Sequence, residues 1–130
     1  MLSTLLWLTL TVYHEARNQD IFDQIAVAHV ILNRSAGDSV KRSVLRANQF
    51  SCYNNGVMLP TDWPALKTSA YVSLVAIRGV DFTGGATYYH TRSVKPYWRH
   101  KVSWVGEFGS HVLYKPMVRL KPERRKIHVM

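Results

Sequence analysis

Two apolar, helix-forming segments separated by only four polar residues, 17–20, constrain the fold of this chain more than any other feature. We expect the first to be a core helix over residues 3–16. Its apolar side chains recur at helical spacing, namely Leu2, Leu5, Leu6, Leu10 and Tyr13. The second begins after a helix cap at Asp20 and runs to about Arg34. It is apolar nearly all round, so we expect it in the middle of the fold.

Glu15 stands at the junction of these segments, with sequence on both sides that should be buried. Burying a carboxylate is costly unless the group is paired or protonated. Such a glutamate therefore serves either chemistry or a specific salt bridge, for which Arg17 and Arg34 are the nearest partners in sequence. The residues alone leave both interpretations open.

The middle of the chain predicts two more helices around an irregular loop. A basic helix over 39–47 should turn three apolar side chains inward, namely Val40, Val44 and Leu45. Residues 48–60 are expected to form the loop. A fourth helix should follow a cap at Thr61 or Asp62, with Pro64 in its first turn. It should end at Gly79, where a left-handed cap is typical.

The chain after residue 81 is dense in aromatic residues. The stretches 102–105 and 111–114 flank a glycine-containing turn and predict a β-hairpin. Helices come first and a small β element last, so the expected class is α+β, mainly helical. The 130 residues show no repeat and no clear linker, which indicates a single domain.

The charge of the chain points to anionic partners. With 17 lysines and arginines against 8 acids, the net charge is +9, and a basic surface attracts polyanions. An anionic cell wall, a lipid surface, nucleic acid, or solubility alone would each account for it. Basic and aromatic residues also interleave over 92–101, as in single-strand nucleic-acid binders, but no recognisable motif supports that function.

Cysteine and metal chemistry find little support in the sequence. Cys52 is the lone cysteine, so no intramolecular disulfide forms, and its context is typical of a buried residue. His14 and Glu15 begin like a zinc-protease helix, but Asn18 stands where the second histidine belongs. We expect neither a metal nor a cofactor.

Glycoside cleavage fits the remaining pattern. A glutamic acid in an apolar setting can protonate the leaving oxygen. Aromatic side chains can stack on sugar faces, and polar ones can bind hydroxyl or acetamido groups; the candidates are Tyr89, Tyr97, Trp98, Gln49, Ser51 and His90.

Several separated motifs, in order, resemble the cell wall hydrolase family of the spore cortex-lytic enzyme type. They are the segments 12–17, 24–34, 49–52, 86–90, 97–98 and 109–114, and the resemblance spans roughly residues 5–115, nearly the whole chain. The resemblance implies a lysozyme-like fold and cleavage between N-acetylmuramic acid and N-acetylglucosamine in peptidoglycan. It places the general acid/base on Glu15. It places groove residues on Gln49, Phe50, Ser51, Tyr89, His90, Tyr97, Trp98 and His111. One departure is Asn18, which replaces a usual glycine but can adopt the left-handed conformation.

The resemblance leaves the reaction product open. A hydrolytic muramidase needs a second carboxylate or an activated water, whereas a lytic transglycosylase needs one acid/base. Three acids, Asp20, Asp23 and Glu107, match no family position, so we favour the one-carboxylate mechanism.

Further expectations concern organisation and location. We expect a catalytic domain over 1–115 and a basic tail over 116–130 that could contact the anionic wall or membrane. By analogy with small lysis enzymes, we expect a monomeric phage endolysin. The N-terminal segment does not read as a cleavable signal peptide. The enzyme should therefore be made in the bacterial cytoplasm and reach the periplasmic wall after release.

Overall fold

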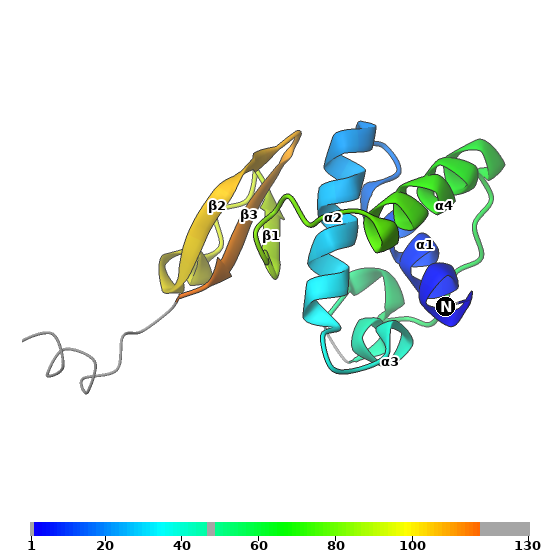
Figure 1. Ribbon diagram of the computed structural model, residues 1–130, viewed down its shortest axis with the longest axis horizontal. Helices are drawn as coiled ribbons and strands as arrows, with labels where there is room; N and C mark the ends of the chain where they lie inside the picture. Colours follow the sequence, from blue (N-terminus) through cyan, green and yellow to red (C-terminus); the bar gives the residue numbers. More distant parts are fainter. Residues whose placement is uncertain (1, 47–48, 118–130) are drawn as a thin grey trace, which may run out of the picture.

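Helices and a small antiparallel sheet form two parts that pack side by side in the computed structural model (Figure 1). The structure describes residues 2–46 and 49–117. Its elements are α1 (Leu2–Ala16), α2 (Ile21–Arg34), α3 (Val40–Leu45), the 3-10 helix η1 (Ser51–Tyr53), α4 (Trp63–Arg78), β1 (Tyr88–Thr91), the 3-10 helix η2 (Tyr97–Lys101), β2 (Val102–Phe108) and β3 (His111–Pro116). The expected α+β class, mainly helical, is confirmed.

Short polar side chains begin three of the helices. Asp20, Ser39 and Asp62 each accept a hydrogen bond from the backbone N–H three residues on, which satisfies a donor that the helix leaves unpaired. Gly79 does end α4, but the expected left-handed cap is wrong because its φ is −92°. A side chain there would place Cβ 2.8 Å from the Val75 carbonyl oxygen, which explains the glycine sterically.

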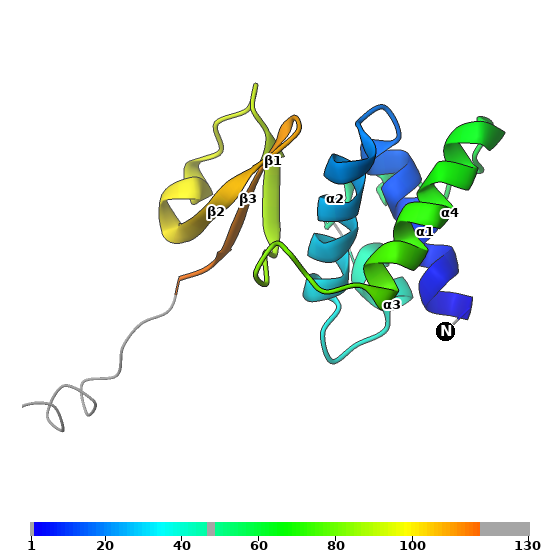
Figure 2. The ribbon, with the colours of Figure 1, turned by 45° about the horizontal axis from the view of Figure 1, so that its top comes forward.

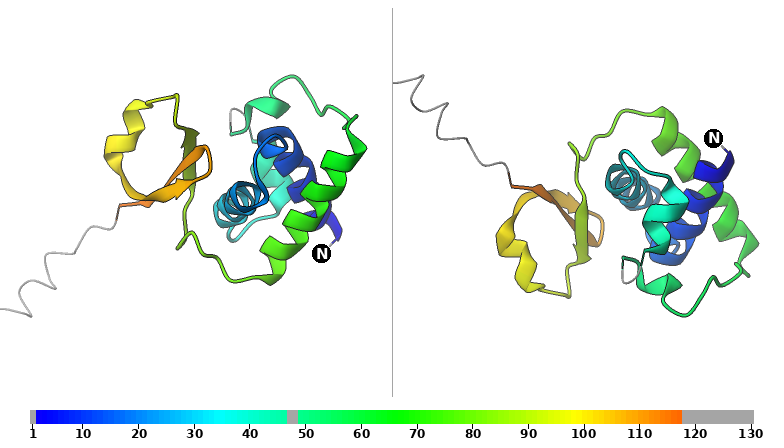
Figure 3. Two further views of the ribbon diagram at one scale, coloured as in Figure 1. Left: turned by 90° about the horizontal axis from the view of Figure 1, so that it is seen from above. Right: turned by 90° about the horizontal axis from the view of Figure 1, so that it is seen from below.

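Helix α2 lies between the other helices and the sheet, as Figures 2 and 3 show from several sides. On one side, Val27 and Ile31 join the core made with α1, α3 and α4. On the other side, Ala26 and Val30 pack against Leu113 of β3. The prediction that an all-round apolar helix lies in the middle of the fold is confirmed.

Two helix faces differ from expectation. The buried face of α1 is centred on Leu8 and Val12, whereas Leu2 and Leu6 are 81% and 61% exposed. Apolar residues cover both sides of this helix, so spacing alone could not select the buried one. In α3, Val40 and Val44 are buried, but Leu45 ends the helix and is exposed; the rest of the expected helix, residue 47, lies outside the described residues. In the described part of the chain, no helix combines the length and apolarity needed to cross a bilayer.

The sheet has the strand order β1-β3-β2, with β3 in the centre and both pairings antiparallel. The expected hairpin is confirmed as β2 and β3. Strand β1 was missed, because a four-residue strand that pairs with a distant segment leaves little periodic signal. Side chains alternate along β1, so Tyr89 and Thr91 face the helices and line one pocket with Glu15. Tyr88 and His90 lie on the opposite, outer face, where both rings contact Trp98. At the start of the strand, Tyr88 also borders a pocket beside Arg34.

Candidate active site

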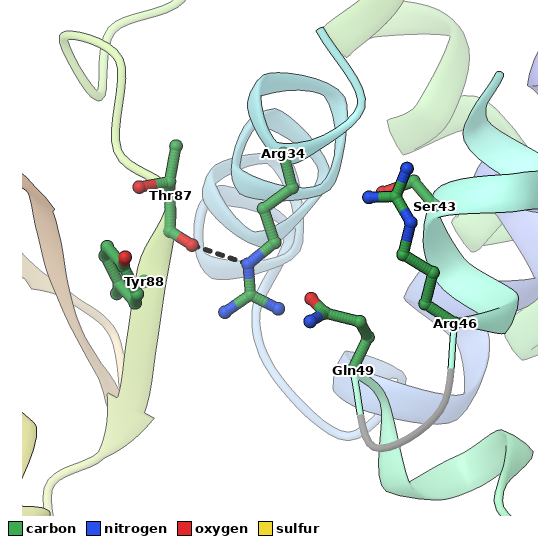
Figure 4. A pocket seen from close by; sticks show the side chains of 6 residues that line it. All are labelled: Arg34, Ser43, Arg46, Gln49, Thr87 and Tyr88. Carbon is green, nitrogen blue, oxygen red and sulfur yellow. Dashed lines mark hydrogen bonds between the residues drawn. The ribbon is translucent and has the colours of Figure 1, made fainter. Parts of the chain in front are cut away.

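A polar groove separates the helical part from the inner face of the sheet. A pocket of about 400 Å³ brings together the end of α1, the segment before and within η1, and the sheet. Its lining residues are Glu15, Arg34, Gln49, Ser51, Tyr89, Thr91 and His111. An adjoining pocket of about 310 Å³ shares Arg34 and Gln49 and continues to Ser43, Arg46, Thr87 and Tyr88 (Figure 4). The two pockets are therefore neighbours, and together they are called the groove.

Glu15 is half-buried near the C-terminal end of α1 and faces Tyr89 of β1. The Tyr89 hydroxyl donates a hydrogen bond of 2.5 Å to Glu15 Oε1. Burial, and after it the neighbouring Glu15, raises the pKa of Tyr89 well above its usual value. Tyr89 thus remains a hydrogen-bond donor at all physiological pH values. Because Oε1 is occupied, Oε2 is the carboxylate oxygen left for a ligand.

Arg34, the last residue of α2, links the two sides of the groove. Its Nε donates a hydrogen bond of 2.5 Å to the Thr87 carbonyl oxygen just before β1. Its guanidinium also lies 5.2 Å and 5.8 Å from the ring centres of Phe50 and Tyr89. Burial lowers the pKa of Arg34, although nearby Tyr89 and Glu15 oppose this effect. Figure 4 shows the guanidinium directed toward Gln49 in the groove.

A buried aspartate orients the histidine of the groove. His111 Nδ1 lies 2.6 Å from Asp23 Oδ1, and Asp23 is fully buried. Asp23 Oδ2 accepts hydrogen bonds from the backbone N–H and the hydroxyl of Ser110, at 3.0 Å and 3.2 Å. The Tyr89 and His111 rings are 5.1 Å apart. Because Nδ1 is bound to Asp23, Nε2 is the ring nitrogen left for the pocket.

The structure brings five of the predicted site residues together and separates four. Glu15, Gln49, Ser51, Tyr89 and His111 share one pocket. Phe50 is 2% exposed and belongs to the helical core, where its ring packs against the guanidinium of Arg34.

The other three predicted groove residues lie away from Glu15, on the outer face of the sheet. His90 binds the Tyr114 hydroxyl through Nε2 at 2.8 Å and contacts Trp98 edge-on. Trp98 packs against Tyr114. Tyr97 precedes it in η2 and is exposed.

Glu15 forms no salt bridge among residues 2–46 and 49–117, because neither Arg17 nor Arg34 lies within ion-pair distance. Arg17 instead binds the carbonyl oxygen of Tyr13. The salt bridge that would give Glu15 a purely structural role is therefore not formed.

The three unmatched acids have other roles in the described structure. Asp20 caps α2, Asp23 holds His111, and Glu107 pairs with Arg92 at 3.0 Å on the outer face. Glu15 is thus the single carboxylate that lines the groove in the described part of the chain.

The described residues offer neither a grouped set of metal ligands nor a reactive cysteine. No cluster of candidate metal ligands occurs within the described ranges. Burial, with Glu15 nearby, raises the pKa of the Cys52 thiol to about 12, which keeps it protonated and poorly nucleophilic.

Sequence reasoning missed six groove residues, Arg34, Ser43, Arg46, Thr87, Tyr88 and Thr91. Arg34 had entered only as a salt-bridge partner. The alternation of Tyr89 with Thr91 along a strand could have indicated Thr91, had β1 been recognised. Nothing in the sequence indicates Ser43, because its helix contributes to the groove only through tertiary packing.

Comparison with known proteins shows which family the chain belongs to. The cell wall hydrolase family model matches residues 18–114, and the chain belongs to this family. The matched range begins after Glu15, so the role of Glu15 depends on geometry and not on this match.

Two solved structures are similar over nearly the whole fold. One is the catalytic domain of the germination-specific lytic transglycosylase SleB from Bacillus anthracis, with 26% identity and a TM-score of 0.74 over 88% of this chain and 96% of that one. The other is the catalytic domain of the Bacillus cereus SleB protein, with 26% identity and a TM-score of 0.73 over 88% and 91%. The expected lysozyme-like fold is confirmed. No curated protein matches the chain significantly.

Proposed function

We propose that this protein is a lytic transglycosylase that cleaves peptidoglycan between N-acetylmuramic acid and N-acetylglucosamine. Glu15 acts as its one acid/base. One observation carries the proposal. Among the described residues, Glu15 is the single carboxylate that lines the groove, and the Tyr89 hydroxyl holds it by a hydrogen bond. Membership of the cell wall hydrolase family and similarity to the SleB lytic transglycosylase support the same substrate and reaction.

In the proposed mechanism, protonated Glu15 gives its proton from Oε2 to the glycosidic oxygen, and the bond from this oxygen to C1 of the muramic acid breaks. The C6 hydroxyl of the same sugar forms a new bond to C1, and its proton returns to Glu15. The products are a 1,6-anhydromuramic end and a free 4-hydroxyl on the other sugar. One carboxylate completes the cycle, because it serves first as acid and then as base.

The neighbours of Glu15 position the reacting groups. Tyr89 fixes Oε1 and so directs Oε2 into the groove. Gln49 and Ser51 border the same pocket and can hydrogen-bond sugar hydroxyl and acetamido groups. The positive charge of Arg34 stabilises the carboxylate form that Glu15 takes after the proton transfer.

A hydrolytic muramidase is the second candidate, and one observation favours it. His111 is held by Asp23 through Nδ1, which leaves Nε2 to accept a proton from a water in the pocket. Such a water would attack C1 in place of the C6 hydroxyl. The two reactions differ in their products.

The decisive experiment is mass spectrometry of purified sacculi after digestion. We expect 1,6-anhydromuramic ends, and reducing muramic ends would overturn the transglycosylase in favour of the muramidase. Glu15→Gln should keep the fold and abolish clearing in a peptidoglycan zymogram. Asp62→Asn is the matched control, because asparagine also caps helices and Asp62 begins α4 away from the groove. Near-full activity of Glu15→Gln would contradict the role of Glu15.

The remaining expectations stay predictions within this proposal. Action on the periplasmic wall after release, a monomeric state and a phage origin fit a small wall-cleaving enzyme. Of the expected basic tail, residues 118–130 lie outside the described residues, so its contact with an anionic wall or membrane rests on charge alone.

A further inference from the structure

A second pocket lies on the outer face of the sheet, away from Glu15. It has a volume of about 430 Å³. Its floor is the sheet itself, with Tyr114 of β3 and His90 of β1 joined by their hydrogen bond. Its walls come from the segment between β1 and β2 and carry Arg92, Lys95 and Arg99. The proposed reaction uses none of these residues.

The positive charge of the described residues is concentrated in the segment that forms the sheet. Residues 88–116 carry five lysines and arginines and one acid, Glu107, whereas residues 2–87 carry seven basic and six acidic side chains. Glu107 lies in the pocket and pairs with Arg92, which leaves Lys95 and Arg99 without a carboxylate partner among the described residues. The pocket is therefore suited to an anionic ligand.

Exposed aromatic rings accompany the charge. Trp104 borders the pocket and is 64% exposed, and Tyr97 in the neighbouring η2 is 77% exposed with Lys101 placed 5.5 Å from its ring centre. A ring held at the edge of a concave site offers a flat apolar face, on which the apolar face of a sugar can stack. Cations beside it offer partners for carboxylates. A pocket with both exposed rings and cations is therefore suited to a glycan that carries carboxylates.

We propose that this outer pocket is a second, non-catalytic binding site for peptidoglycan. It takes a sugar of a neighbouring strand on Trp104 and a carboxylate of the attached peptide on Lys95 and Arg99. The inference rests on the proposed function, because it takes peptidoglycan as the polymer. With sites on opposite faces of the sheet, the enzyme holds one strand while another occupies the groove, which raises its local concentration on the wall.

The test measures binding without cleavage, so all variants are made in the Glu15→Gln background. Trp104→Ala and Lys95→Gln are compared by co-sedimentation with purified sacculi. The controls are Trp63→Ala and Lys67→Gln on α4, because Trp63 is 65% exposed and thus matches Trp104, and Lys67 is also exposed. Circular dichroism verifies that every variant is folded.

We expect each outer-pocket variant to weaken binding by about fivefold, which corresponds to about 1 kcal/mol for the loss of one stacking contact or one charge contact. The controls should bind like the parent. The effect of Lys95→Gln should shrink as salt increases, because exposed charges are screened. In the parent, a soluble disaccharide-peptide should shift the NMR signal of the Trp104 indole N–H.

Unchanged sedimentation of the double variant Trp104→Ala/Lys95→Gln would overturn the second site while leaving the zymogram and product assignment intact. Binding of single-stranded DNA, or of vesicles of anionic phospholipid, that is stronger than binding of sacculi and lost in the same variants would also overturn it. A zymogram without clearing would instead reject the proposed function, whatever the binding data show.

Discussion

Gly109 controls how the β2–β3 turn docks on α2, and its substitution by alanine is predicted to be severe. Its φ is +61°, in the region that costs other residues roughly 1–2 kcal/mol. A Cβ at this position would lie 2.5 Å from Asp23 Oδ2 and 2.8 Å from Asp23 Cβ, so the aspartate or the turn must move. Gly109→Ala therefore combines backbone strain with disruption of the Asp23 contacts.

The magnitude follows from those contacts. Asp23 accepts hydrogen bonds from the Ser110 N–H, the Ser110 hydroxyl and His111. A hydrogen bond to a charged group contributes about 1.5–3 kcal/mol. Loss of one such bond plus the strain gives a destabilisation of about 2.5–5 kcal/mol, a large part of the roughly 5–15 kcal/mol typical of a domain. For this chain length, the melting temperature should fall by about 10–20 °C.

Gly37→Ala is the matched control, because Gly37 has a φ of +80° but nothing within 4 Å of the added Cβ. Gly37→Ala should lower the free energy of unfolding by the backbone strain alone, about 1–2 kcal/mol. Urea denaturation followed by circular dichroism gives both values. If Gly109→Ala and Gly37→Ala destabilise the protein equally within about 0.5 kcal/mol, a typical scatter for such measurements, the reasoning about Asp23 is refuted.

Two further predictions concern the groove, and a third concerns Cys52, the neighbour of Ser51. Tyr89→Phe removes the hydrogen bond to Glu15 and should lower the turnover number about tenfold or more with little loss of stability; unchanged turnover would contradict the orienting role. Arg34→Gln should reduce stability, because the hydrogen bond to Thr87 is lost, and should reduce activity, because the half-buried positive charge near Glu15 is lost; unchanged stability in denaturation and unchanged turnover would contradict this. Cys52 should resist iodoacetamide at pH 8, since its pKa is raised to about 12. The folded state holds the thiol proton more tightly than the unfolded state. The contribution of this group to the free energy of unfolding is therefore complete below the ordinary thiol pKa near 9 and declines as pH rises toward 12. Rapid alkylation of Cys52 at pH 8 would contradict the raised pKa.

The helical part of the fold was accessible from sequence because its signals are local. Caps at Asp20 and Asp62 and the all-round apolarity of α2 depend on residues within a few positions of one another. The exposed leucines of α1 were misjudged, because which apolar side is buried depends on where α2 and α4 pack. The packing of these helices is tertiary structure, and the sequence of α1 itself does not indicate it.

The candidate site was predictable only in part, for a related reason. Glu15 and His111 could be named from motifs, but strand alternation decides which neighbours face the groove. Tyr89 points to Glu15 and the adjacent His90 points away from it. Without the register of β1 on β3, the two could not be separated, and His90, Tyr97 and Trp98 were predicted to line the same groove as Tyr89.

The strand order β1-β3-β2 has a consequence for the time at which the enzyme becomes active. Both β1 and β2 pair only with β3 in the sheet, and β3 is made last of the three. During synthesis neither earlier strand has its hydrogen-bonding partner until residues 111–116 have left the ribosome. The same strand carries His111 into the groove and brings the turn that meets Asp23. A nascent chain can therefore fold its helices early while its cleft stays unfinished until translation has passed the central strand.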